Sequence, residues 1–352
     1  MGIILVTELI LRMYNPWIDD VAGDRILLST NKTTIINNIN PKLPSKWQIR
    51  TNNLGFRGSD LPDKPEEYFK IFVIGGTQAY SIAIDEEHHW SNILAAKLAG
   101  YSSKIWLNNA AFKFFSTTGA KIMMEDHILK TEPQMVLFYL GFDDMTLNGL
   151  TEYGFNTVSK KIKYLLFKSQ LIRTMWTLRA HAKAEMNYHD MSINYQEEGI
   201  LEQEGHRTQD LIKKHLPALK KYRSGLKELI TICKINHIQP VFITHPQLYG
   251  QYTDPELNMD MSKLKISDMA VEGRWINSGY YDQLLSLYNN EVRSICREND
   301  IPFIDLDSLM PKGTKYYFDQ LDFSHQGQHE AANILYNHLI PLISNIYCFN
   351  SG

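Results

Sequence analysis

The pattern of hydrophobic and polar positions changes near Lys70. From there, short and nearly continuous apolar runs alternate with segments of helical periodicity. Strands whose two faces are both buried have this pattern, which predicts a parallel sheet covered by helices on each face. The runs are KIFVIGG, KIWLNNAA, MVLFYLG, PVFITH and PFIDL, which begin at residues 70, 104, 135, 240 and 302. The sequence therefore predicts an α/β fold, a three-layer α/β/α sandwich over residues 69–348.

One predicted helix shows helical periodicity clearly. Its apolar side chains recur at intervals of three and four residues, which places them on one face and predicts that this face packs against the sheet. The apolar positions are Tyr281, Leu284, Leu285, Tyr288, Val292, Ile295 and Cys296.

Residues 1–68 form a different region, in which short apolar runs alternate with Asn, Pro and Gly. This composition predicts turns and short strands in an N-terminal arm or small subdomain. The first apolar run is broken by Glu8 and Arg12 and is far shorter than the roughly 20 residues that span a bilayer. No basic leader or small-residue cleavage site is recognisable. We expect an amphipathic helix, or the remnant of an anchor whose upstream part is missing, so the compartment stays open.

The segment at about 148–205 is an insertion that the predicted sheet does not require. It is rich in basic residues and has no acidic residue between the first of them and Glu185. Such a helix could lie on an anionic membrane or cover the site as a lid, or it could present a basic solvated face above an apolar stripe. The basic residues are Lys160, Lys161, Lys163, Lys168, Arg173, Arg179 and Lys183.

Composition excludes several classes of function. The 352 residues carry a net charge of -3, with both signs spread along the chain. Nucleic-acid binding needs a concentrated basic surface, so a DNA or RNA partner is not expected. Cys233, Cys296 and Cys348 lie far apart with no CxxC, so neither a disulfide framework nor a zinc site is predicted. No cofactor is implied.

Candidate chemistry lies directly after the predicted strands. Ligands of open parallel sheets bind beyond the carboxyl ends of the strands, so these strand tips are expected to converge. The stretches at the tips are GGTQAYS, with Thr77 in a tight turn, then NNAAFKFFSTTG and GFDD, and YYFDQLDFSHQG before the last helix.

These stretches, in this order, resemble the SGNH (GDSL) hydrolases, and more narrowly bacterial members associated with extracellular polysaccharide gene clusters. The likeness runs from ELILRMYNP and TNNLGFRG through KIFVIGGTQAYS and THPQLYG to FDQLDFSHQG. It implies the flavodoxin-like SGNH fold and an O-deacylase type of carboxylic-ester hydrolase. In that family a serine attacks an ester carbonyl, a glycine amide and an asparagine form the oxyanion hole, and an Asp-x-x-His pair activates the serine.

The resemblance places altered residues at these positions. The nucleophile position is Thr77, whose methyl group crowds attack without abolishing it. The oxyanion glycine position is Phe114, and the asparagine position is Asp143, whose carboxylate repels an oxyanion.

The last block can be aligned in two registers. Gly327 fixes one, in which Asp322 takes the histidine position and Asp319 the aspartate position, so that the base is lost. His325 then follows Ser324, the expected N-cap, and lies in the first turn of the helix, where the helix dipole disfavours an imidazolium. In the other register Asp322 and His325 form the Asp-x-x-His pair, which requires the helix to begin a turn later.

Three hypotheses follow. The first is a catalytically impaired SGNH-like protein that binds a glycan or a partner protein. The second is an active acyl-ester hydrolase that uses Thr77 with Asp322 and His325. In the third, a carboxylate-lined site at the strand tips binds Ca²⁺ or Mg²⁺.

Surface contact with a membrane, through the N-terminal helix or the basic insertion, is a further expectation. Ser81 and Ser116 are interpreted as structural hydroxyls and His245 as a buried, satisfied histidine. The ligands of the third hypothesis would be Asp143, Asp144, Asp319, Asp322 and His325.

Overall fold

The computed structural model describes most of the predicted sandwich and part of the N-terminal region. The predicted insertion at about 148–205 lies outside the described residues except at a few positions, and Phe114 lies outside them as well. The described ranges are 2–14, 19–22, 25–28, 30–37, 46–113, 115–146, 169, 171–172, 174–175, 205–267 and 275–349.

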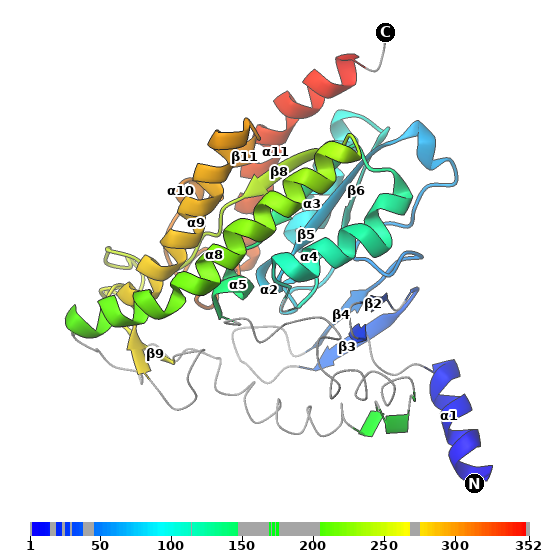
Figure 1. Ribbon diagram of the computed structural model, residues 1–352, viewed down its shortest axis with the longest axis horizontal. Helices are drawn as coiled ribbons and strands as arrows, with labels where there is room; N and C mark the ends of the chain where they lie inside the picture. The colour runs from blue at the N-terminus through cyan, green and yellow to red at the C-terminus, as the bar shows by residue number, and fades with distance from the viewer. Residues whose placement is uncertain are drawn as a thin grey trace.

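A five-stranded, fully parallel sheet forms the centre of the molecule, and it confirms all five predicted strands (Figure 1). The strand order is β11-β8-β7-β5-β6, so the first strand of the sheet lies between the second and the third. This is the flavodoxin-like order, in which the chain changes direction across the sheet between the first and third strands. The strands are β5 (Phe69–Gly75), β6 (Ile105–Asn109), β7 (Met135–Tyr139), β8 (Gln239–Ile243) and β11 (Phe303–Ile304).

Helices cover both faces of this sheet, as predicted. On one face α3 contacts α11 and β6, and on the other α8 lies between α4 and α9. The long helices are α3 (Trp90–Tyr101), α8 (Gly205–Ile235), α9 (Ser278–Asn299) and α11 (His325–Phe349). The shorter ones are α2 (Thr77–Tyr80), α4 (Thr117–Met123), α5 (Phe142–Thr146) and α10 (Leu306–Leu309), with the turns η1 (Pro65–Glu67), η2 (Met124–Ile128) and η3 (Leu129–Thr131).

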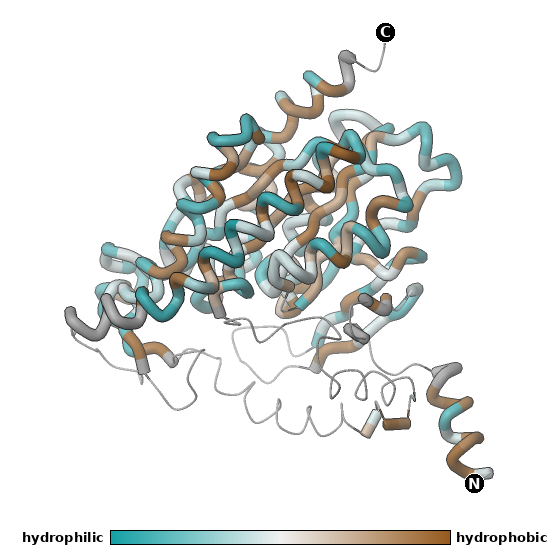
Figure 2. The backbone as a smooth tube through the Cα atoms, in the orientation of Figure 1, coloured by the Kyte–Doolittle hydropathy of each residue, from teal (hydrophilic) through white to brown (hydrophobic). Residues whose placement is uncertain are grey.

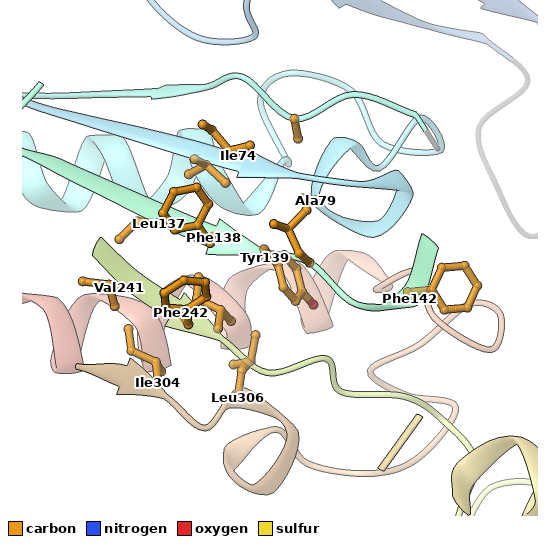
Figure 3. Packing of buried hydrophobic residues seen from close by; sticks show 14 of the residues in the cluster. Ile74, Ala79, Leu137, Phe138, Tyr139, Phe142, Val241, Phe242, Ile304 and Leu306 are labelled. Atoms are coloured by element: carbon orange, nitrogen blue, oxygen red, sulfur yellow. The ribbon is translucent and has the colours of Figure 1, made fainter. Parts of the chain in front are cut away.

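The core is continuous across the sheet. Every residue of β5, β6 and β7 is buried. Phe138 and Phe242 on the neighbouring strands β7 and β8 stack with their ring centroids 5.0 Å apart (Figure 3). All seven apolar residues predicted for the helical face at 281–296 are buried in α9, so that prediction is confirmed.

Outside the main sheet, the described strands form antiparallel pairs. Short strands within residues 1–68 agree with the sequence pattern, whereas the pair β9–β10 has no clear alternating signal. The pairs are β1 (Asp19–Ala22) with β2 (Arg25–Leu28), β3 (Thr33–Asn37) with β4 (Lys46–Arg50), and β9 (Lys265–Ser267) with β10 (Trp275–Asn277). The helix expected at the N-terminus is α1 (Gly2–Tyr14). Within the described ranges, none of the helices combines the length and apolarity that crossing a bilayer requires.

The packing of α9 makes a testable prediction. Leu285 is fully buried, so Leu285→Ala leaves a cavity and is expected to lower the free energy of unfolding by about 2–5 kcal/mol. Gln283→Ala, on the exposed side of the same helix, is the matched control and should change it by less than about 0.5 kcal/mol. Urea unfolding measures both, and equal effects would contradict the assigned face.

Candidate functional site

The candidate site lies where the strand order changes direction. Thr77 is the first residue of α2, directly after β5, and Asp143 is in α5, just after β7. These two strands are neighbours, with Gly75 opposite Tyr139 in the register. The carboxyl ends of the first and third strands are where flavodoxin-like sheets bind ligands.

Asp143 and Thr77 make two hydrogen bonds with each other. The Thr77 backbone N–H donates to Asp143 Oδ2 at 2.8 Å, and the Thr77 hydroxyl donates to Asp143 Oδ1 at 2.7 Å. The carboxylate lies so close to the turn that a Cβ on Gly76 would come within 1.7 Å of Asp143 Oδ2. One carboxylate therefore engages both the hydroxyl and the backbone N–H of Thr77.

Asp144 repeats this arrangement on the neighbouring tip. The Thr117 N–H donates to Asp144 Oδ1 at 3.0 Å, and the Thr117 hydroxyl donates to the same oxygen at 2.8 Å. Thr117 is the first residue of α4, just as Thr77 is the first residue of α2. The two consecutive aspartates thus bind the amino ends of two different helices, where negative charge is favourable.

Burial weakens the acidity of both carboxyls. It raises the pKa of Asp143 to about 7, against the lowering effect of the Thr77 donors. Burial likewise raises the pKa of Asp144 to about 7, with a further rise from the charge of Asp143. Each group therefore changes charge near neutral pH instead of near the ordinary value of 3.8.

Asp319 and Asp322 lie in the loop before the last helix. Asp319 Oδ1 accepts the backbone N–H groups of Leu321 and Asp322, at 2.9 and 2.7 Å, so it stabilises a turn. Asp322 Oδ1 is buried and has no hydrogen-bond partner among the described residues. Burial, and then the charges of Asp319 and Asp143, raise the pKa of Asp322 well above its usual range. Asp322 thus shares the electrostatic environment of Asp143, as expected for converging strand tips.

His325 begins α11, and its ring stacks on the ring of His88 with centroids 4.4 Å apart and planes 12° apart. Ser324 is the N-cap, since its hydroxyl accepts the Gly327 N–H at 3.1 Å. The helix start therefore agrees with the register that places Asp322 at the histidine position. In the described part of the chain, no hydrogen bond joins His325 to Asp322 or Thr77. Burial, and then the charge of His88, lower the pKa of His325.

Gln78 is a site residue that the sequence interpretation missed. It is buried, and its Nε2 donates to the carbonyls of Leu321 and Pro246, while its Oε1 accepts from His245 Nδ1. One amide therefore links the loop after β8 and the loop before α11 to the turn of Thr77. Its position in the sequence could have identified it, because Gln78 is the polar residue directly after Thr77, the position of the nucleophile in the resemblance.

His245 is a satisfied, buried histidine, as interpreted from the sequence. Its ring stacks on Tyr139 with centroids 4.3 Å apart, and burial lowers the pKa of His245 to about 3. A neutral imidazole that donates to Gln78 has a structural role in this arrangement.

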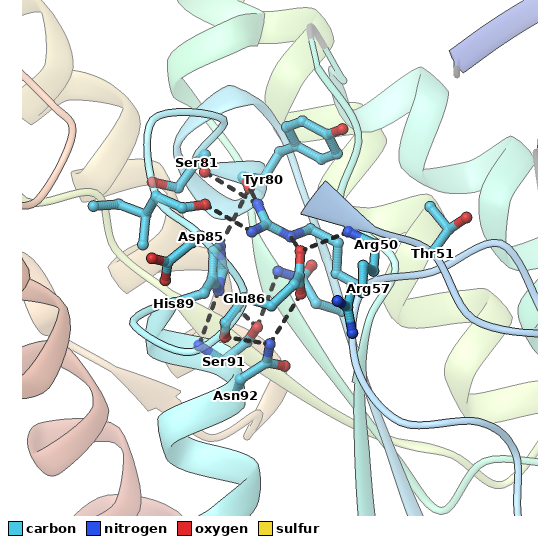
Figure 4. Close-up of polar contacts among 12 residues, drawn as sticks. Arg50, Thr51, Arg57, Tyr80, Ser81, Asp85, Glu86, His89, Ser91 and Asn92 are labelled. Carbon is cyan, nitrogen blue, oxygen red and sulfur yellow. Dashed lines mark hydrogen bonds and ion pairs between the residues drawn. The ribbon is translucent and has the colours of Figure 1, made fainter. Parts of the chain in front are cut away.

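Arg57 fixes the loop that follows α2 (Figure 4). Its buried guanidinium donates to the carbonyls of Tyr80, Ser81 and Ile84, and its Nε lies 2.8 Å from Glu86 Oε1. Cationic donors that engage several carbonyls in a buried place give rigid attachments. Arg57 belongs to the stretch TNNLGFRG, which is part of the resemblance described from the sequence. Through Arg57 this stretch holds the loop that follows the helix of Thr77.

Ser81 and Ser116, which the sequence analysis interprets as structural hydroxyls, lie in different settings. Ser81 ends α2 with a left-handed backbone (φ 44°), and its hydroxyl accepts from Gln328 Nε2 at 3.2 Å. Ser116 precedes the first residue of α4 and is buried. Ser81 is thus structural, in line with its interpretation.

The carboxylates do not assemble into a metal site in the part of the chain that the structure describes. No group of three or more His, Cys, Asp or Glu side chains there is arranged to hold an ion. Two surface hollows lie at the other end of the sheet, at or just before the amino ends of β5, β7 and β8. Lys70, Gln134 and Gln239 are among the residues that line them. The third hypothesis, a carboxylate-lined cation site, therefore finds no support in the described geometry.

The close approach of Asp143 to the turn predicts a large effect of Gly76→Ala. The new methyl group would overlap Asp143 Oδ2, so we expect the carboxylate to be displaced and the free energy of unfolding to fall by at least about 1–3 kcal/mol. Gly100→Ala is the matched control, because nothing lies within 4 Å of its Cβ position in α3 and removing a helical glycine stabilises by about 0.5–1 kcal/mol. Thermal unfolding that ranks the two variants in the opposite order would contradict this geometry.

The raised pKa of Asp143 predicts a pH dependence. A carboxyl whose pKa rises on folding stabilises the protein below its unfolded pKa, near 3.8, and this contribution is lost as pH rises to about 7. Asp143→Asn should therefore flatten the pH dependence of the free energy of unfolding in this window, by up to about 1.4 kcal/mol per pH unit. Urea unfolding at several pH values between these limits measures the slope, and parallel curves for both proteins would refute the assignment.

Comparisons with known proteins give distant structural matches only. No protein-family model matches the chain, and no curated protein matches it either. An acetylxylan esterase from Geobacillus stearothermophilus is 13% identical with a TM-score of 0.44, over 76% of this chain and 93% of that one. A psychrotrophic esterase from Pseudoalteromonas sp. is 12% identical with a TM-score of 0.43, over 78% and 99%. A GDSL-like lipase from Bacteroides thetaiotaomicron is 9% identical with a TM-score of 0.41, over 81% and 92%.

Proposed function

We propose that this protein is a non-hydrolytic member of the SGNH/GDSL esterase lineage, which binds a glycan or a partner protein at the strand tips. The observation that carries the proposal is the pair of hydrogen bonds from Thr77 to Asp143. In the acyl transfer of that family, an asparagine amide at the position of Asp143 donates to the oxyanion. Here Asp143 is a carboxyl group that accepts both donors of Thr77, so the position is committed to the turn and does not supply the amide donor.

The electrostatics support the loss of hydrolysis. Removing one oxyanion-hole donor costs on the order of 3 kcal/mol in the transition state, and a carboxylate in its place also repels the developing charge. A general base must accept a proton near neutral pH. Asp322, at the family's histidine position, is a buried carboxyl whose pKa burial raises well above its usual range, and its Oδ1 has no hydrogen-bond partner among the described residues.

A second candidate is an acyl-ester hydrolase, and one distance favours it. Thr77 Oγ1 lies 2.7 Å from Asp143 Oδ1, and burial raises the pKa of Asp143 to about 7, which suits a base that works at neutral pH. In this mechanism Asp143 would take the hydroxyl proton as Thr77 attacks the ester carbonyl, and it would return this proton to the departing alcohol as the acyl–threonine ester forms. Water would then hydrolyse that ester and regenerate Thr77. The hydrolase expected from the other register would instead use His325 as the base, with Asp322 as its partner.

Hydrolysis of a short activated acyl ester distinguishes these candidates. The proteins compared are the wild type, Thr77→Ala, Asp143→Asn and His325→Ala. Thr117→Ala is the matched control, because Thr117 makes the same contacts to Asp144 away from the proposed nucleophile. For a binding protein we expect background rates in all five. A loss of at least about 100-fold in Thr77→Ala but not in Thr117→Ala would overturn the proposal.

The other two variants then identify the base. A parallel loss in Asp143→Asn with His325→Ala unaffected would assign a Thr77–Asp143 hydrolase. A parallel loss in His325→Ala would assign the register that pairs His325 with Asp322.

A further inference from the structure

Lys70 is a buried lysine that the proposed function does not use. It is the second residue of β5, whose other residues are apolar, and it is 4% exposed. The centre of the molecule, through which β5 runs, is largely hydrophobic (Figure 2). The backbone N–H of Lys70 donates to Gln134 Oε1 at 2.7 Å, which fixes the strand at this position. A lysine is almost never fully buried unless its charge is paired, so a partner is expected for this ammonium.

The described part of the chain supplies no such partner. The ammonium of Lys70 has neither a hydrogen bond nor an ion pair there, and it experiences only the charges of Glu132 and Glu66. Burial outweighs these two charges and lowers the pKa of Lys70. Burial also lowers the pKa of Lys312, but the Nζ of that lysine donates to the carbonyl of Gln247 at 2.7 Å. Lys70 is therefore a buried cation whose hydrogen bonds remain available to a ligand.

Lys70 faces one of the two surface hollows at the amino ends of the strands, which has a volume of about 500 Å³. Glu66 and Glu132, whose charges act on the ammonium, line the same hollow, so the ammonium lies on that side of the sheet. Side chains alternate along a strand, which places Phe72 on the same face as Lys70. Phe72 packs edge-on against Phe56, another lining residue, with ring centroids 5.8 Å apart. Small-molecule sites have volumes of about 300 to 1,000 Å³, and this hollow is within that range.

The lining combines apolar walls with charges of both signs. Leu54, Phe56 and Leu61 supply the apolar walls. Two lysines and three carboxylates complete the charged lining, so carboxylates outnumber lysines. Glu66 and Glu132 are exposed at the rim, whereas Lys70 is buried at the floor. The charged residues are Lys70, Lys130, Glu66, Asp126 and Glu132.

We propose that this hollow binds a free amino acid with an apolar side chain. The ligand's carboxylate accepts charge-assisted hydrogen bonds from the ammonium of Lys70. Its own ammonium lies near the carboxylates of Glu66 and Glu132, and its side chain contacts the apolar walls. The excess of carboxylates disfavours phosphates and other multiply charged anions, and the buried lysine disfavours a simple amine.

The position of the hollow separates this proposal from the proposed function. The hollow lies at the amino ends of the strands, and the site of Thr77 lies beyond their carboxyl ends. Binding at Lys70 is therefore independent of the hydrogen bonds between Thr77 and Asp143. A failure of one proposal leaves the other standing.

The test is isothermal titration calorimetry on the full chain, with leucine and phenylalanine as probes. Two analogues of leucine separate its charged groups, because isocaproate lacks the ammonium and isoamylamine lacks the carboxylate. Lys70→Met removes the cation and keeps an unbranched apolar side chain, and Lys227→Met, at an exposed lysine of α8, is the matched control. Glu66→Gln removes one carboxylate from the rim, where the substitution is exposed and leaves the fold intact.

We expect the wild type to bind leucine or phenylalanine saturably, Lys70→Met to bind it at least about tenfold more weakly, and Lys227→Met to bind it unchanged. Isoamylamine should also bind at least about tenfold more weakly than leucine, because it has no carboxylate for Lys70. Isocaproate with the wild type, and leucine with Glu66→Gln, should each show a smaller loss of about two- to fivefold, since the rim is exposed to solvent.

Three results would overturn the proposal. The first is the absence of saturable binding of both amino acids by the wild type. The second is equal affinity of the wild type and Lys70→Met, which would remove the buried ammonium from the site. The third is an analogue that binds as tightly as leucine or more tightly, which would assign the hollow to a monocarboxylate or to an amine.

Discussion

The burial of the parallel sheet on both faces is the constraint on which the rest of the structure depends. Because β5, β6 and β7 are buried along their whole length, polar side chains with a possible chemical role gather at the strand tips. The tips converge where the strand order changes direction, between β5 and β7. Arg57 and Gln78 then fix the loops there, each through several hydrogen bonds from a buried side chain. Both supports are buried polar groups, and the loss of either would leave several hydrogen-bonding groups unsatisfied.

The consecutive residues Asp143 and Asp144 give this site its unusual character. Each accepts both the hydroxyl and the backbone N–H of a threonine that begins a helix, and the two helices follow different strands. A buried carboxylate is expensive unless such donors compensate it. The pair therefore joins the tips of three strands through the hydroxyl and N–H donors of two threonines.

Apolar residues have two distinct uses in the described chain. Those of the sheet and of α9 are hidden from water, whereas those of α1 remain in contact with it. Hydrophobic burial stabilises the sandwich without any contribution from the outward face of α1.

The sequence by itself determined the strands of the sandwich and their order along the chain. The five strands, the buried face of α9, the start of α11 at His325 and its cap at Ser324 all depend on residues within a few positions of one another, so periodicity and capping signals suffice. Only the tertiary structure decided which side chains meet. Thr77 and Asp143 are 66 positions apart, and Gln78 and Leu321 are 243 apart. The stack of His325 on His88 has no local signal either. Such pairs are set by the packing of strand tips, which no short stretch of sequence encodes.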